Sequence, residues 1–249
     1  MGLVASVRPK ASVTMAVFVL AGMHFSRQPI SWFVVCMVLF IAMFAMSWND
    51  LYDRAADRQK GKMYAWEHPK RLTALVSVLA VISFSMTLFA FTLRTGFGCL
   101  GVAIWFSSAI YPFLQTRPCI KNVTVALTVG ATVLFPLCVQ FSAAQWLLFC
   151  SLCLLTSARE FLGDVDGVRV EQFYKRTAAM VWGVPRSKNV AATLLIASSL
   201  VAFLWPAFLL AAIPTLVGAV LLLVNKNYAV ARLLLELSLV GWGVAAYMS

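Results

Sequence analysis

Nine long apolar blocks follow one another along the chain, and they limit its fold more than any other feature. The blocks cover residues 9–26, 31–48, 72–93, 95–116, 122–141, 145–162, 189–206, 207–224 and 230–248. A helix needs about 20 mostly apolar residues to cross the roughly 30 Å hydrocarbon core of a bilayer. The blocks lack the alternation of polar and apolar positions that the strands of a membrane β-barrel require. The pattern therefore predicts an all-α membrane protein with nine transmembrane helices, in a single domain spanning residues 1–249.

The charged residues are few and unevenly placed. The chain is 62% hydrophobic and only 12% charged, whereas soluble domains average about 25% charged residues. If the N-terminus is cytoplasmic and nine helices follow, 18 of the 20 Lys and Arg residues lie on the cytoplasmic side, with Arg27 and Arg94 opposite. This distribution satisfies the positive-inside rule. We therefore predict a multi-pass protein of a bacterial inner membrane or an organellar membrane, with its N-terminus and acidic loops on the cytoplasmic side. The net charge of +11 then reflects topology in a lipid bilayer, not a nucleic-acid partner.

Eight of the nine acidic residues fall into two groups, one after the second block and one after the sixth. The first group is Asp50, Asp53, Asp57 and Glu67, and the second is Glu160, Asp164, Asp166 and Glu171. Asn49, Asp53 and Asp57 recur every four residues and therefore share one face of a continuing helix. Like charges at this spacing repel by about 0.2–0.5 kcal/mol per pair, so the pattern costs stability unless a cation binds there.

The chemistry of these side chains favours magnesium. Carboxylate and amide oxygens, without thiol or imidazole, suit Mg²⁺, which often bridges a protein to phosphate oxygens. Two acidic helix ends at one membrane surface can hold a diphosphate between them through Mg²⁺, with nearby Lys and Arg completing the anion site. The alternative is a solvated helix end whose Asp residues pair with Arg54, Arg58 and Arg71.

The run Asn49–Asp57, NDLYDRAAD, resembles the first signature of the UbiA superfamily of intramembrane prenyltransferases, NDxxDxxxD. Arg159–Asp164, REFLGD, begins like the second signature of that family, and Arg176-Thr177 follows at the expected distance. In this second motif Gly167 and Glu171 stand where the family has its middle and third acids, and Asp166 lies one residue early. Three other features that resemble the family are Arg8-Pro9, Tyr111 and Lys121-Asn122.

The resemblance implies a fold and an activity. The fold is nine transmembrane helices enclosing a central cavity, capped by loops 2–3 and 6–7. The activity is Mg²⁺-dependent transfer of a prenyl group from a polyprenyl diphosphate to a small, aromatic acceptor through an allylic carbocation. The expected catalytic residues are Asp50, Asp53, Asp57 and Asp164. The expected Mg²⁺ ligands are Asn49, Asp53, Asp57, Asp164, Glu171, Asp166 and Glu160. The expected diphosphate-binding residues are Asn49, Arg71, Lys70, Lys121 and Tyr111.

Aromatic side chains in the cavity wall could stabilise the carbocation by cation–π attraction. Tyr111, Trp105 and Phe113 are the candidates, and ordinary helix packing is the alternative for each of them. Asp50 or a loop carboxylate is the candidate base.

Other functions stay open on the sequence alone. A membrane terpene cyclase of the UbiA type would use the same motifs and form product without an acceptor. A transporter is possible because acids in membrane segments often mark ion pathways, although here they gather at helix ends. A catalytically silent partner protein would be consistent with Gly167 in place of an acid.

Overall fold

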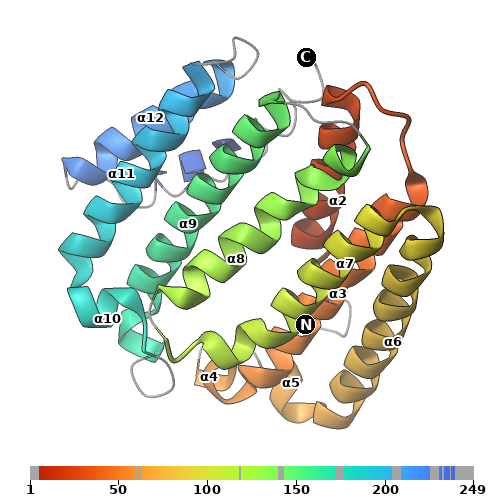
Figure 1. The fold of residues 1–249 in the computed structure, drawn as a ribbon. Helices are drawn as coiled ribbons and strands as arrows, with labels where there is room; N and C mark the ends of the chain where they lie inside the picture. Colours follow the sequence, from red (N-terminus) through yellow and green to blue (C-terminus); the bar gives the residue numbers. More distant parts are fainter. Residues whose placement is uncertain are drawn as a thin grey trace.

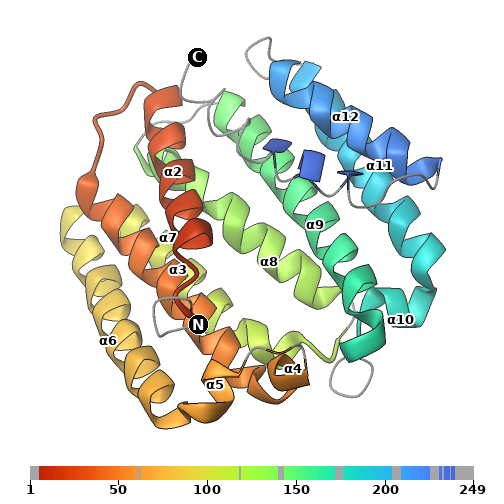
Figure 2. The same ribbon diagram turned by 180° about the vertical axis from the view of Figure 1, so that it is seen from behind.

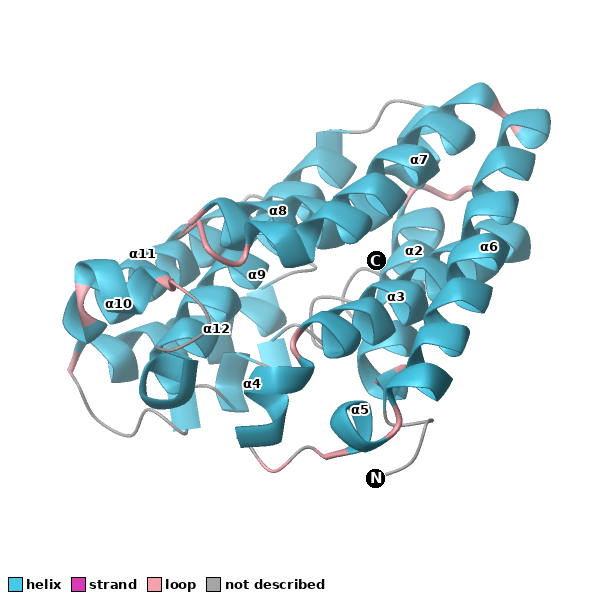
Figure 3. Cartoon of the chain, turned by 90° about the horizontal axis from the view of Figure 1, so that it is seen from below, coloured by secondary structure: helices cyan, strands magenta, loops and turns pink. Residues whose placement is uncertain are grey.

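The computed structural model describes residues 6–59, 61, 63–117, 119–139, 143–171, 176–203, 209–224, 230–231, 233–235 and 237–238. Every element in these ranges is a helix, which confirms the all-α fold class (Figures 1 and 3). The first elements are α2 (Pro9–Phe25), α3 (Trp32–Tyr52), α4 (Arg54–Gln59), α5 (Tyr64–Glu67), α6 (Pro69–Leu93), α7 (Thr95–Ile110) and η1 (Tyr111–Leu114). They are followed by α8 (Ile120–Ala131), η2 (Thr132–Cys138), α9 (Ala143–Glu171), α10 (Ala178–Trp182), α11 (Val184–Phe203) and α12 (Leu209–Leu223).

Five of the helical segments in the described ranges are long and apolar enough to cross a bilayer. They are Trp32–Tyr52, Pro69–Leu93, Thr95–Leu114, Ile120–Cys138 and Gln145–Val168. Large apolar side chains such as Val81 and Leu200 are exposed on the outer surface, as expected for helices that face lipid. The chain is therefore a multi-pass integral membrane protein. The first eight predicted blocks each coincide with a helix or with a helix and its 3₁₀ extension, whereas most of the ninth, 230–248, lies outside the described residues.

The sixth helix is much longer than its apolar block. The apolar block ends at residue 162, but α9 continues to Glu171, so the second acidic group lies on a helix and not in a loop. The first group is also partly helical, since α3 carries Asn49 and Asp50 in its last turn. Asp53 itself lies in the turn between α3 and α4.

Prolines convert the ends of two spans into 3₁₀ helix. Pro112 lies in η1 and Pro136 lies inside η2, and proline cannot donate the backbone hydrogen bond that continues an α-helix. The tighter η2 packs closely on α2. A Cβ on Gly22 would lie only 3.0 Å from the carbonyl oxygen of Val133, so this contact requires glycine.

The helices form two neighbouring groups. On one side α3 packs against α2, α6 and α7, and on the other α9 packs against α8 and α11, with α12 outside α11 (Figures 1 and 2). The short helices α4, α5 and α10 all lie at one end of the bundle, together with η1 and the C-terminal ends of α3 and α9. Because α4 also contacts α9, the two acid-bearing segments meet at this end.

Candidate active site

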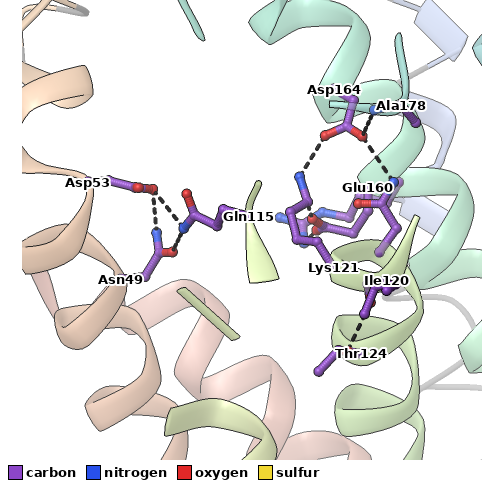
Figure 4. A network of polar contacts seen from close by, with 11 residues as sticks. Asn49, Asp53, Gln115, Ile120, Lys121, Thr124, Glu160, Asp164 and Ala178 are labelled. Carbon is purple, nitrogen blue, oxygen red and sulfur yellow. Dashed lines mark hydrogen bonds and ion pairs between the residues drawn. The ribbon is translucent and has the colours of Figure 1, made fainter. Parts of the chain in front are cut away.

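The first acidic group is organised around a triangle of hydrogen bonds at the end of α3 (Figure 4). Asn49 Nδ2 donates to Asp53 Oδ2 over 3.2 Å, and Gln115 Nε2 donates to Asn49 Oδ1 over 2.8 Å and to Asp53 Oδ2 over 3.3 Å. Asp53 is 8% exposed and Gln115 only 2%. The Gln115 Oε1 atom is buried and has no hydrogen-bond partner. These donors are neutral amides, so they orient Asp53 without adding a positive charge.

The second acidic group is organised around Asp164 on α9, which faces Lys121 at the start of α8 (Figure 4). Lys121 Nζ lies 2.6 Å from Asp164 Oδ1, and Asn122 Nδ2 donates to Oδ2 over 3.0 Å. The backbone N–H of Ala178 donates to the same Oδ2 over 3.3 Å. One ammonium group therefore compensates this buried carboxylate, and two neutral donors fix its orientation.

Glu160 lies one helical turn before Asp164 and is held between two cations. Its carboxylate oxygens lie 3.9 Å from Lys121 Nζ and 3.6 Å from Arg159 Nη1. Lys121 thus bridges Glu160 and Asp164, as the i, i+4 spacing on α9 allows.

The remaining predicted acids have different surroundings. Asp50 forms an ion pair with Arg8, which precedes α2. Asp57 is buried on α4 and Asp166 is exposed on α9. Glu171 ends α9, and its side chain lies outside the described part of the structure.

Lys70 and Arg71 were predicted to bind the diphosphate, but they lie exposed in the first turn of α6. Neither is among the described residues that line the cavity. Their role in diphosphate binding stays a prediction.

A cavity of about 610 Å³ extends into the bundle from the acidic end. One wall is a stripe on α3 at spacings of three and four residues: Val38, Ile41, Ala42, Ala45, Met46 and Asn49. A matching stripe on α7 and η1 is Ile104, Ser107, Ser108 and Tyr111. Glu160 on α9 lines the same cavity, so both acid-bearing helices contribute to one site. The volume lies within the roughly 300–1,000 Å³ typical of small-ligand pockets.

Tyr111 lines the cavity together with Asn49 from one acid-bearing helix and Glu160 from the other. Tyr111 therefore lies at the polar end of the cavity.

Trp105 and Phe113 are not among the described residues that line the cavity, which agrees with the alternative of ordinary helix packing. Trp105 follows Ile104 by one residue, which rotates its side chain about 100° around the helix axis. Its ring stacks on Phe44, with centroids 5.3 Å apart. Phe113 instead packs against Trp48 and Tyr52, with centroids 6.2 and 5.5 Å away. Only Tyr111 of the three candidates is a wall residue.

Comparison with known proteins agrees with this arrangement. Residues 11–238 match the UbiA prenyltransferase family. The chain belongs to this family. No curated protein matches the sequence closely enough to indicate a particular UbiA relative.

Solved UbiA structures share the fold at low identity. The apo UbiA homologue from Aeropyrum pernix K1 has a TM-score of 0.77 and 14% identity, covering 97% of this chain and 99% of its own. A digeranylgeranylglyceryl phosphate synthase has a TM-score of 0.73 and 17% identity, covering 98% and 97%. The UbiA homologue from Archaeoglobus fulgidus bound to GPP and Mg²⁺ has a TM-score of 0.68 and 12% identity, covering 98% of both chains.

The first acidic group fits the Mg²⁺ that the UbiA family uses. No three His, Cys, Asp or Glu side chains gather as a metal cluster within the described ranges. Mg²⁺ does not require such a cluster, because it is often held by one or two carboxylates plus substrate phosphates. Asn49 Oδ1 and Asp53 Oδ2 are hard oxygens that converge on one point, now filled by the Gln115 amide.

The sequence analysis missed Gln115, and it assigned no role to Arg8 or Asn122. The available signal was their polarity, because a buried polar side chain in a membrane bundle usually has a partner and a function. Gln115 also lies four residues after Tyr111, but the 3₁₀ turn that aims it at α3 is not evident from spacing alone.

Proposed function

We propose that this UbiA protein is a Mg²⁺-dependent prenyltransferase that moves a prenyl group from a polyprenyl diphosphate to a small aromatic acceptor. The observation that carries the proposal is the shared cavity. Asn49 from one acid-bearing helix and Glu160 from the other line the same cavity, and its deeper walls are largely apolar. A charged diphosphate headgroup suits the end of the cavity with Asn49 and Glu160, and an apolar prenyl chain suits the deeper walls.

The headgroup is held at the acidic end. Asn49, Asp53 and Asp57 form the cation-binding side, with Asp50 supporting them through Arg8. Asp164 positions Lys121 at the opposite side, next to the cavity-lining Glu160, and the cavity-lining Arg8 and Arg159 add positive charge to offset the phosphates. Bound Mg²⁺ would stabilise the negative charge that develops on the leaving diphosphate.

The reaction is a substitution at an allylic carbon. The carbon–oxygen bond to the diphosphate breaks, and the electron pair leaves with the diphosphate. The Tyr111 ring faces the resulting allylic cation and stabilises it by cation–π attraction, while the apolar walls exclude water. An aromatic carbon of the acceptor forms the new bond and then loses its proton. Glu160, the carboxylate among the described cavity-lining residues, is placed to accept that proton.

The membrane arrangement follows the same reasoning. We propose nine spans in one domain, with the N-terminus and both acidic segments on the cytoplasmic side, because that orientation places 18 of the 20 Lys and Arg residues there. The segments between α3 and α6 and between α9 and α11 then form loops 2–3 and 6–7, which cap the cavity.

The proposal is tested with purified protein in lipid nanodiscs. Prenyl diphosphates of several chain lengths are incubated with Mg²⁺ and a panel of aromatic acceptors, and products are identified by mass spectrometry. We expect prenylated acceptor and one released diphosphate per product. Product formed without an acceptor would indicate a cyclase. If no substrate released diphosphate, the proposed enzyme activity would be contradicted. A transporter or a catalytically silent partner protein would then be the remaining alternatives.

A further inference from the structure

Gln115 occupies the position between the two oxygens that a cation at the first acidic group would use. Its Nε2 lies 2.8 Å from Asn49 Oδ1 and 3.3 Å from Asp53 Oδ2 (Figure 4). An amide NH₂ group carries partial positive charge, so it satisfies these acceptors in the same way that a bound cation would. The two oxygens are thus already oriented toward a common centre.

The other end of the same amide is unsatisfied. Gln115 Oε1 is buried without a hydrogen-bond partner. A buried acceptor that receives no hydrogen bond costs about 1–3 kcal/mol. A half-turn about the terminal side-chain bond would exchange the nitrogen and the oxygen without changing the outline of the side chain. That turn would bring three oxygens, from Asn49, Asp53 and Gln115, around one point. Without a cation the three would repel, but around Mg²⁺ they form a suitable set of hard ligands.

We infer that Gln115 is a third oxygen ligand of the Mg²⁺ site formed with Asn49 and Asp53, and that its amide turns over when the ion binds. This inference rests on the proposed function, because it concerns the cation site of the same reaction. It assigns a ligand that lies outside both acidic motifs.

The surrounding contacts hold Gln115 in place for this role. Trp48 Nε1 donates to the carbonyl oxygen of Ala109 over 3.0 Å, which ties α3 to the end of α7. The Phe113 ring packs against Trp48 and Tyr52 on α3. Because Gln115 directly follows η1, these contacts fix its backbone relative to Asn49 and Asp53, and only the terminal amide needs to rotate.

The chain offers a matched control in Gln145 on α9. Gln145 is also fully buried, its Nε2 donates to Gly22 O over 3.2 Å and to Ser26 Oγ over 2.8 Å, and its Oε1 also lacks a partner. Its acceptors are a backbone carbonyl and a hydroxyl, with no carboxylate. A buried glutamine with an unpaired oxygen is therefore common to both sites, and the acidic partner distinguishes Gln115.

The experiment measures Mn²⁺ binding by electron paramagnetic resonance, with Mn²⁺ alone as the probe and no prenyl substrate. Wild-type protein in nanodiscs is compared with Gln115→Met, Gln115→Glu, Gln145→Met and Asp53→Ala. We expect Gln115→Met to weaken Mn²⁺ binding about 10–100-fold, as for other changes at metal sites. Gln115→Glu supplies an oxygen in the same place and should bind Mn²⁺ at least as tightly as wild type. Gln145→Met should bind like wild type.

The Gln115 assignment would be overturned if Gln115→Met bound Mn²⁺ as tightly as wild type while Asp53→Ala bound it weakly. The proposed function would then remain intact. If Gln115→Met does not fold, Gln115→Glu decides the question, because binding weaker than wild type would contradict a ligand role. No Mn²⁺ binding by wild type would overturn the inference, while the product assay above judges the proposed function separately.

Discussion

The two buried carboxylates at the acidic end of the cavity are held in different ways. Asp53 receives hydrogen bonds from the neutral amides of Asn49 and Gln115, whereas Asp164 is compensated by the ammonium group of Lys121. Neutral donors such as these amides orient a carboxylate without offsetting its charge. A bound lysine removes that charge from the site but stabilises the fold. The first group is therefore suited to bind a cation, and the second to position a cationic side chain for an anion.

The largest effect should follow from breaking the Asp164 pair. Lys121→Met leaves Asp164, which is 2% exposed, without its ammonium partner. Removing one partner of a buried ion pair costs about 3–5 kcal/mol. We expect a marked loss of thermal stability, measured by differential scanning fluorimetry. The double variant Lys121→Met with Asp164→Asn should recover part of the loss, and no recovery would argue against the pairing.

The corresponding change in the first group should affect turnover more than stability. Asp53→Ala removes a carboxylate assigned to the cation, and we expect turnover to fall by about 10²–10³-fold, the cost of removing one stabilising group from a charge-developing site. Thermal stability without ligand should change less than in Lys121→Met. If Asp53→Ala and Lys121→Met lowered thermal stability by similar amounts, the proposed difference between the Asp53 and Asp164 sites would be contradicted.

Tyr111 lines the same cavity and should show an intermediate effect. A desolvated cation–π contact contributes about 2 kcal/mol, which corresponds to roughly 30-fold in rate. We expect Tyr111→Leu to lose about this factor in kcat, while Tyr111→Phe retains most of the activity because it keeps the ring. Equal losses would assign the effect to the hydroxyl group.

A smaller effect should be seen at Cys119, which precedes α8. Burial, and then the negative charge of Asp164, raise the pKa of the Cys119 thiol. A raised pKa means less thiolate at neutral pH, so alkylation should be slower than for an unperturbed thiol and should accelerate only at higher pH. The measurement uses a variant in which the other five of the six cysteines are replaced by Ala. Asp164→Asn should lower this pKa and speed the reaction. An unchanged rate would show that Asp164 does not act on Cys119.

Much of the fold could be predicted from the sequence because apolar length directly reports membrane spans. The same reasoning singled out Asn49, Asp53 and Asp164, since charges are rare in this chain and the spacing of these residues predicts shared helix faces, and their roles stay predictions. It could not find Gln115, because the 3₁₀ turn at Pro112 changes the direction of the chain just before it. It could not choose among Tyr111, Trp105 and Phe113 as wall residues, because a shift of one residue on a helix moves a side chain to another face. It also put the second acidic group in a loop, because composition alone does not show where α9 ends.

The central claim is that Mg²⁺ and groups from both acid-bearing helices bind one prenyl diphosphate at the mouth of the cavity. Isothermal titration calorimetry with geranyl diphosphate tests it directly, with Mg²⁺ present or with EDTA, on wild type and on the variants Asn49→Ala and Asp164→Asn. The account predicts binding that requires Mg²⁺ and that weakens in both variants. Equal affinity in EDTA, or a loss confined to one of the two helices, would contradict it.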